Sequence, residues 1–188
     1  MKNAKFYLRK KSLLARKKNY AKIKKFDFNL IFKLIKKHFH NKRIIIAGYY
    51  PSYYEVDILN FLEQASKKKF RIALPVIRSA NSMIFRSWFF KDPLYVSNFG
   101  TLEPKNLKQK VIPDLIIVPL VAFDRQLNRI GYGKGYYDRC LRKIVKNKNK
   151  IVSVGIAYSF QQCSKVPVNK NDFKLDYIFT EREIISSN

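Results

Sequence analysis

The feature that most restricts the backbone of this chain is a set of three glycines at alternate positions, Gly131, Gly133 and Gly135. The whole sequence of 188 residues contains only six glycines. Because glycine tolerates positive φ and lets another molecule approach the backbone, successive amides of this segment can turn toward a bound anion. The spacing fits neither the dinucleotide fingerprint G-x-G-x-x-G nor the phosphate loop G-x-x-x-x-G-K-S/T. It therefore predicts a phosphate or nucleotide site of a third kind.

A helix is expected directly after these glycines. Apolar residues recur there at helical spacing, namely Tyr137, Cys140, Leu141, Ile144 and Val145. The glycines therefore precede the positive end of a helix, where anions bind favourably. Arg129 and Lys134 add cations, and the carboxylate of Asp138 can hold a metal ion. The alternative is a flexible glycine hairpin with solvated charges, which the scarcity of glycine elsewhere disfavours.

Composition favours one folded domain, residues 1–188. Hydrophobic residues make up 47% of the chain and aromatic residues 15%, which excludes a disordered protein. Two cysteines, Cys140 and Cys163, are too few for a disulfide framework and lack the spacing of metal ligands. The chain starts with a basic segment rather than an apolar signal, and no apolar run approaches the ~20 residues of a membrane span. A cytoplasmic protein without membrane contact is expected.

The formal net charge of +26 suggests polyanions as partners. The first 25 residues carry eleven lysines and arginines and no acidic residue, so a nucleic-acid-binding protein is one alternative. A/T-rich codons would also produce the abundant Lys, Asn, Ile, Phe and Tyr, and a charge run is usually a solvated helix face. Because no nucleic-acid-binding motif accompanies the charge, nucleic acid is not the favoured partner.

The order of elements predicts an α/β protein with a mostly parallel sheet. Residues 44–47 and 114–119 are continuous apolar runs of the kind buried on both faces of such a sheet. Helices are expected over 2–20, 27–38 (capped by Asp27) and 56–68, and strands over 43–49, 71–74, 83–88, 114–119, 151–158 and 175–180. Pro75 is expected to end its strand, and residues 92–111 to be irregular. The glycine segment then follows the carboxyl end of a central strand, the usual place for a ligand.

Residues 128–139, Asn-Arg-Ile-Gly-Tyr-Gly-Lys-Gly-Tyr-Tyr-Asp-Arg, resemble the signature of the 5-formyltetrahydrofolate cyclo-ligase family, also called 5,10-methenyltetrahydrofolate synthetase. Other segments match in order along nearly the full length: Lys5-x-x-Leu8-Arg9, Tyr50-Pro51, Glu55, Leu74-Pro75, Glu103-Pro104, 119–124, 155–158 and 167–172. The resemblance implies a single three-layer α/β/α domain. It also implies an ATP- and Mg²⁺-dependent enzyme that converts 5-formyltetrahydrofolate to 5,10-methenyltetrahydrofolate and releases ADP and phosphate. A nucleotide-binding module without catalysis is a further alternative.

The resemblance also assigns roles to residues. ATP would contact Lys5, Arg9, Arg129, Ile130, Gly131, Tyr132, Gly133, Lys134, Gly135, Tyr136 and Tyr137. Arg129, Lys134 and Tyr137 would be catalytic, and Asp138 and Asp172 would hold Mg²⁺ through hard oxygen ligands. For Lys5 and Arg9 the alternative is a solvated basic helix face.

The folate, with or without a polyglutamate tail, would contact Tyr50, Glu55, Met83, Phe99, Tyr132, Gly133, Lys134, Gly135 and Tyr136. Glu55 could accept paired hydrogen bonds from the pterin, and its alternative is a carboxylate at a helix start. Tyr50, Met83 and Phe99 could instead be core residues. Tyr132 departs from the family, because relatives can carry arginine at this place in the loop.

Overall fold

The computed structural model describes residues 2–22, 25–40, 42–105, 108–148 and 150–187. Within them, one eight-stranded sheet has the order β12-β11-β10-β7-β1-β2-β3-β6. Its strands are β1 (Ile45–Ala47), β2 (Arg71–Ser79), β3 (Ser82–Trp88), β6 (Lys110–Val111), β7 (Leu115–Pro119), β10 (Val152–Ile156), β11 (Tyr177–Phe179) and β12 (Ile184–Ser186). The run from β11 to β2 is parallel, and β12, β3 and β6 are antiparallel additions at the two sides.

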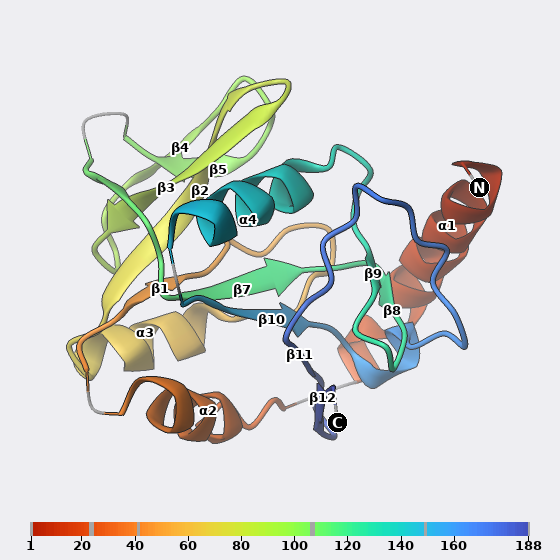
Figure 1. Ribbon diagram of the computed structural model, residues 1–188, viewed down its shortest axis with the longest axis horizontal. Coiled ribbons are helices and arrows are strands. Elements are labelled where there is room, and N and C mark those ends of the chain that lie inside the picture. Colours follow the sequence, from red (N-terminus) through yellow and green to blue (C-terminus); the bar gives the residue numbers. More distant parts are fainter. Residues whose placement is uncertain (1, 23–24, 41, 106–107, 149, 188) are drawn as a thin grey trace.

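Helices cover both faces of this sheet (Figure 1). Helices α2 (Asn29–Phe39) and α3 (Leu59–Lys67) lie on one face, and α4 (Tyr136–Asn147) lies on the other. The central strand β7 is buried on both sides: Leu115 and Ile117 belong to the apolar cluster with α2 and α3, whereas Ile116 and Val118 belong to the cluster with α4. This arrangement confirms the predicted three-layer α/β/α architecture with a mostly parallel sheet.

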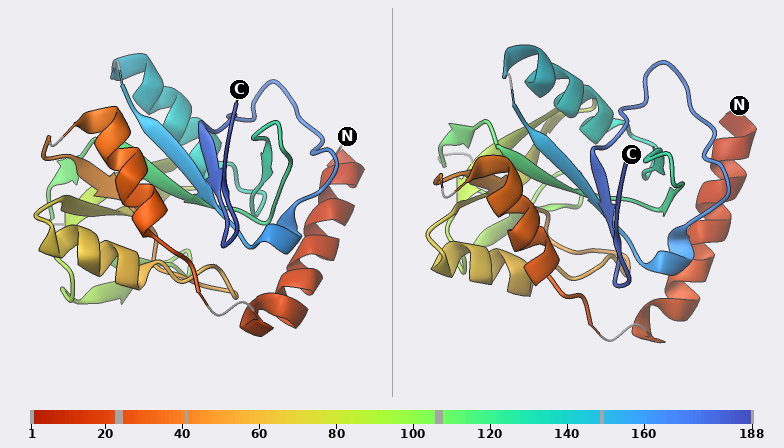
Figure 2. Two further views of the ribbon diagram at one scale, coloured as in Figure 1. Left: turned by 90° about the horizontal axis from the view of Figure 1, so that it is seen from below. Right: turned by 60° about the horizontal axis from the view of Figure 1, so that its bottom comes forward.

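Helix α1 (Lys2–Asn19) belongs to neither layer. It lies beyond the carboxyl ends of the parallel strands, beside the small hairpin of β8 (Ala122–Phe123) and β9 (Arg129–Ile130), as Figures 1 and 2 show. Its apolar side chains Leu8 and Leu13 pack on a small buried cluster at this hairpin. None of the described helices has the length and apolar character that crossing a membrane requires.

Some predicted element boundaries were wrong. Strand β2 passes through Pro75 and continues to Ser79. Its pairing with β1 ends at Ala73, so Pro75 has β3 as its partner in the ladder and is tolerated as in an edge strand. Helix α3 begins at Leu59, three residues later than expected. The carboxylate of Asp57, just before the helix, accepts the Leu59 N–H at 2.8 Å.

The segment 92–111, expected to be irregular, contains a second small sheet. Strands β4 (Leu94–Val96) and β5 (Leu102–Pro104) form a hairpin, and β6 follows. Gly100, at φ 74°, lies in the turn of this hairpin. Strands of two or three residues are too short for an alternating pattern to be recognised, which is also why β12 was not predicted. At α2 the cap position is Phe28 rather than Asp27, although the Asp27 carboxylate accepts the Asn29 N–H at 3.1 Å.

Candidate functional site

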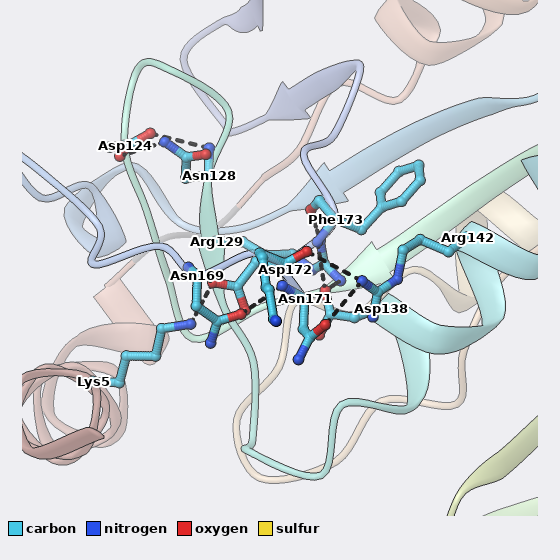
Figure 3. A network of polar contacts seen from close by, with 11 residues as sticks. Lys5, Asp124, Asn128, Arg129, Asp138, Arg142, Asn169, Asn171, Asp172 and Phe173 are labelled. Atoms are coloured by element: carbon cyan, nitrogen blue, oxygen red, sulfur yellow. Dashed lines mark hydrogen bonds and ion pairs between the residues drawn. The ribbon is translucent and has the colours of Figure 1, made fainter. Parts of the chain in front are cut away.

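The candidate site lies at the carboxyl edge of the parallel strands. Strand β7 leads through the β8–β9 hairpin into residues 131–135 and then into α4, so the predicted position of the glycine segment is confirmed. The hairpin turn is held by the buried carboxylate of Asp124, which accepts the Asn128 N–H at 3.0 Å (Figure 3). The same carboxylate accepts the N–H groups of Gln126 at 3.0 Å and of Val166 at 2.9 Å. The glycine segment therefore follows a hairpin whose turn is held by hydrogen bonds.

Two of the three glycines use the conformation that glycine permits. Gly133 and Gly135 have φ values of 99° and 67°. A Cβ at Gly133 would lie 3.2 Å from Arg9 Cζ, and one at Gly135 would lie 2.8 Å from Arg139 Nη1. Gly135 is also the cap residue of α4 and has no side chain to accept the first amides of the helix. These amides are therefore available to an anion.

Arg129 lies in β9 rather than in the loop, and its side chain is only 4% exposed. Its guanidinium donates to Asp138 Oδ1 at 2.6 Å and to the carbonyl oxygen of Phe173. The Phe173 N–H donates to the same Asp138 oxygen at 3.0 Å. Burial lowers the pKa of Arg129, and the neighbouring Asp138 opposes this, so the guanidinium remains a buried cation (Figure 3).

Helix α1 brings two of the predicted cations to the loop. Lys5 Nζ forms an ion pair with Asp172 Oδ2, which also accepts the Asn169 N–H at 2.7 Å (Figure 3). Arg9 Nε donates to the Gly131 carbonyl oxygen at 2.8 Å. Both side chains therefore contact the site rather than forming a solvated face. Lys134, in contrast, is exposed to solvent at the tip of the loop.

Glu55 contacts the glycine loop through a hydrogen bond with Tyr132. It lies between β1 and α3 and precedes the first helical residue by four positions, so its alternative interpretation as a carboxylate at the helix start is wrong. The Tyr132 hydroxyl donates to Glu55 Oε1 at 2.7 Å, and the Ser52 N–H donates to Oε2 at 2.8 Å. Burial raises the pKa of the Glu55 carboxyl, while these hydrogen bonds and the charge of Arg16 act against that rise.

Arg16 is a residue of this site that the sequence interpretation missed. Its side chain lies under the loop, and the residue is only 1% exposed. Nη2 donates to the Tyr132 hydroxyl at 2.5 Å and to the Tyr53 carbonyl oxygen at 2.8 Å. A usable signal was present, because Lys5, Arg9 and Arg16 are spaced four and seven apart and so share one face of a helix.

Two tyrosines follow the glycines at the start of α4. The Tyr137 hydroxyl is buried and has no hydrogen-bond partner among the described residues. Burial raises its pKa well above the ordinary value, so the group is a neutral phenol that can donate. The ring of Tyr136 packs edge-on against Phe99 at 6.5 Å between centroids and lies under the guanidinium of Arg139.

The three predicted apolar folate contacts lie in different places. Phe99 lines a hollow of about 530 Å³ beside the β4–β5 hairpin, and Tyr50 lines a second hollow of about 390 Å³ with Trp88 and Phe90. Met83 is buried in the apolar cluster beneath α4. The structure thus joins Glu55 to the loop through Tyr132 but does not bring Tyr50, Met83 and Phe99 into one pocket.

Asp138 and Asp172 belong to one network of polar contacts around Arg129 (Figure 3). Each uses one carboxylate oxygen in the bonds already given. No group of three or more His, Cys, Asp or Glu side chains suited to a metal ion occurs among the described residues. Two carboxylates with one further oxygen each fit a Mg²⁺ ion that also takes phosphate oxygens and water, because Mg²⁺ in phosphate sites usually has one or two protein carboxylates.

Known proteins resemble this chain in sequence along most of its length. The sequence profile of the 5-formyltetrahydrofolate cyclo-ligase family matches residues 1–181. A 5-formyltetrahydrofolate cyclo-ligase of Haemophilus influenzae is 32% identical over 136 residues, which are 69% of this chain and 72% of that protein. The enzyme of the same name from Escherichia coli is also 32% identical, over 69% of this chain and 74% of that protein.

The fold agrees with solved structures. A 5,10-methenyltetrahydrofolate synthetase of Mycoplasma pneumoniae matches with a TM-score of 0.70 and 26% identity, covering 95% of this chain and 99% of that one. The NMR structure of the Aquifex aeolicus 5,10-methenyltetrahydrofolate synthetase matches with a TM-score of 0.70 and 27% identity, covering 97% and 92% of the two chains. Together with the signature at residues 128–139, these matches show that the chain belongs to the 5-formyltetrahydrofolate cyclo-ligase family of ligases.

Proposed function

We propose that this protein converts 5-formyltetrahydrofolate to 5,10-methenyltetrahydrofolate, with ATP hydrolysed to ADP and phosphate and with Mg²⁺ bound. The observation that carries the proposal is the hydrogen bond of 2.7 Å between Tyr132 and Glu55. It joins a loop suited to phosphate to a carboxylate suited to the pterin. Two substrates held on either side of this contact would meet, as a transfer between them requires.

The reaction itself explains why a phosphate loop is needed. The formyl group on N5 is an amide, whose oxygen is a poor leaving group when N10 attacks the formyl carbon. Transfer of the γ-phosphoryl group to that oxygen, with ADP leaving, turns it into a phosphate ester. Attack by N10, loss of its proton and departure of phosphate then close the ring. Enzymes promote such transfers mainly by positioning and by neutralising charge on the phosphates.

The loop residues would do this positioning. The amides of residues 131–135 and of the first turn of α4 would donate hydrogen bonds to the phosphates, with Arg9 and Lys134 as nearby cations. Arg129 would contribute its positive charge rather than a direct hydrogen bond to the phosphates, because its guanidinium already donates to Asp138 and to the Phe173 carbonyl oxygen. The hydroxyl of Tyr137, which has no hydrogen-bond partner in the described part of the chain, would donate to a phosphate or formyl oxygen.

Asp138 and Asp172 would hold Mg²⁺, each through the carboxylate oxygen left over from its hydrogen bonds. A bound Mg²⁺ would supply positive charge to the phosphates. The ion pair of Lys5 with Asp172 would orient that carboxylate from α1. Glu55, held by Tyr132 and Ser52, would accept hydrogen bonds from the N–H groups of the pterin.

An absorbance assay for methenyltetrahydrofolate tests the proposal. Purified protein is mixed with 5-formyltetrahydrofolate, ATP and Mg²⁺, and product is expected to accumulate with one ADP released per product formed. Omitting ATP, or chelating Mg²⁺, is expected to stop product formation. ATP binding without turnover would favour a nucleotide-binding module. Tight, strongly salt-dependent binding of nucleic acid without turnover would favour the nucleic-acid alternative.

A further inference from the structure

Arg16 contacts the glycine loop and the Glu55 segment at the same time. It reaches both from α1, whose residues are more than 100 positions away from Tyr132. Nη2 donates to the Tyr132 hydroxyl at 2.5 Å and to the Tyr53 carbonyl oxygen at 2.8 Å, and Nη1 donates to the Leu120 carbonyl oxygen at 3.3 Å. One buried guanidinium therefore fixes a point on each of three segments.

The direction of the hydrogen bonds around Tyr132 is determined by chemistry. A guanidinium can only donate, and an ionised carboxylate can only accept. Tyr132 must therefore accept from Arg16 and donate its single proton to Glu55, which lies 2.7 Å away. Arg16 and Glu55 are therefore linked by two consecutive hydrogen bonds that share the Tyr132 hydroxyl.

Arg16 also fixes the turn that carries Glu55. Tyr53 and Tyr54 both have positive φ, at 47° and 63°, which is strained for residues other than glycine. The Glu55 N–H closes this turn on the Ser52 carbonyl oxygen at 2.9 Å. Arg16 donates to the carbonyl oxygen of Tyr53. It therefore stabilises a turn that the positive φ values of Tyr53 and Tyr54 disfavour.

The guanidinium of Arg16 is not fully satisfied by these bonds. Its Nε–H is buried and has no hydrogen-bond partner among the described residues. A buried N–H without a partner destabilises the folded state, so stability alone does not account for an arginine at this position.

We infer that Arg16 is a positioning residue for folate binding, which holds the Tyr132 hydroxyl and the Tyr53 turn so that the carboxyl group of Glu55 stays aimed at the pterin. The inference rests on the proposed role of Glu55. Among the described residues, the phenols Tyr49 and Tyr137 also lie near Glu55 and are uncharged near neutral pH. Arg16 contributes a positive charge that lowers the pKa of this carboxyl group.

The test compares Arg16→Gln and Tyr132→Phe with the unchanged protein. Calorimetric titration with 5-formyltetrahydrofolate, without ATP, gives the dissociation constant between pH 5.5 and 8. The pKa of Glu55 is already raised by burial, and loss of the Arg16 charge or of the Tyr132 donor raises it further. Affinity is therefore expected to fall by about tenfold to a hundredfold, and its loss on acidification is expected to begin at a higher pH in both variants.

Three controls separate positioning from damage. Arg125→Gln removes an exposed arginine paired with Glu183 and is expected to bind folate as the unchanged protein does. Arg16→Lys keeps the charge but loses the forked geometry, so the pH profile is expected to stay near that of the unchanged protein while affinity falls. If Arg16→Gln does not fold, as judged by circular dichroism, Tyr132→Phe alone decides, because it leaves the bonds of Arg16 to Tyr53 and Leu120 intact.

Unchanged folate affinity and pH profile in both variants would overturn the inference. So would a loss of Mg-ATP affinity with folate binding intact, which would assign Arg16 to the phosphate side. If the unchanged protein neither binds nor converts 5-formyltetrahydrofolate, the proposed function fails and the inference fails with it. If the unchanged protein does both and the variants match it, only the inference fails.

Discussion

Arg129 and Asp138 form an ion pair of 2.6 Å in which the arginine side chain is almost completely buried and the carboxylate is 25% exposed. The same carboxylate oxygen also accepts the Phe173 N–H. Asp138 therefore neutralises a buried cation through one oxygen while its side chain stays partly exposed. A change at this residue would therefore test its part in stability and its proposed part in metal binding, and the two effects can be measured separately.

Asp138→Asn is expected to lower turnover by about a hundredfold or more, by analogy with the loss of one electrostatic group from a catalytic site. The amide keeps the shape of the side chain but not the charge that would neutralise Mg²⁺ and Arg129. The fold is expected to persist with a loss of about 1 to 3 kcal/mol in the free energy of unfolding. Turnover at saturating Mg²⁺ and urea denaturation measure the two effects. Turnover equal to that of the unchanged protein would refute the metal role.

Gly133→Val and Gly135→Val are expected to abolish ATP binding. Both glycines have positive φ, which β-branched residues resist, and a side chain there would also meet Arg9 or Arg139. Gly131→Ala provides a graded comparison and is expected to lose less ATP affinity. Gly131 does not have a positive φ, and among the described residues, its chain neighbours aside, no atom lies within 4 Å of the added Cβ. Fluorescence titration with a nucleotide analogue measures all three. Full ATP affinity in either valine variant would make the loop a structural turn only.

Glu55→Gln is expected to weaken folate binding while leaving Mg-ATP affinity nearly unchanged. The amide replaces one acceptor with a donor, which faces the Ser52 N–H or a pterin N–H. A charge-assisted hydrogen bond contributes ~1.5 to 3 kcal/mol and an unmatched buried donor costs a similar amount, so affinity should fall by about one to three powers of ten. Separate calorimetric titrations check this. Equal losses for both ligands would indicate a collapsed site instead.

The same substitution has an opposite expected effect on stability. Burial raises the pKa of Glu55 above its ordinary value of 4.5, so the folded protein binds this proton more tightly than the unfolded chain does. The contribution to stability is present at low pH and is lost as pH rises from the ordinary value through the raised one. Glu55→Gln, which does not titrate, should therefore remove this loss: without ligand, its melting temperature should fall less between pH 5 and 7 than that of the unchanged protein. An equal fall in both proteins would contradict this.

Tyr137→Phe is expected to slow turnover without destabilising the fold, because the hydroxyl it removes has no partner among the described residues. Tyr49→Phe is the matched control. The Tyr49 hydroxyl donates to the Val56 carbonyl oxygen at 2.8 Å, so its removal should cost about 1 kcal/mol of unfolding free energy. Chemical denaturation of both variants and their turnover numbers make the comparison. Equal turnover in Tyr137→Phe and the unchanged protein would remove this hydroxyl from the mechanism.

The layers of the fold were predictable because they depend on local patterns. The apolar run of β7 is buried on both faces, and the glycines at 133 and 135 use the positive φ that their spacing suggested. Lys5 and Arg9 were placed at the site by resemblance, and both reach it. The extent of a single domain over 1–188, and the roles of the site residues, stay predictions.

The contacts that were missed depend on distant residues. Arg16 lies in a run of basic residues, and its helical spacing from Lys5 and Arg9 indicates a shared face but not that Arg16 is buried while its neighbours Lys17 and Lys18 are exposed. Its buried environment exists only because Tyr53, Leu120 and Tyr132 converge on it in the folded chain. The same holds for Pro75, whose tolerance in β2 depends on where β1 stops pairing.

The position of α1 has a consequence for the order in which the protein can mature during synthesis. Its contacts with the glycine loop and with Asp172 span 116 to 167 residues of sequence. During synthesis, Lys5, Arg9 and Arg16 therefore lack these partners until the chain has been made as far as Gly131, Tyr132 and Asp172. Such distant pairings form late and slowly. A nascent chain that has completed β7 already contains most strands of its sheet, but the proposed phosphate site still lacks its glycine loop and the contacts of that loop with α1.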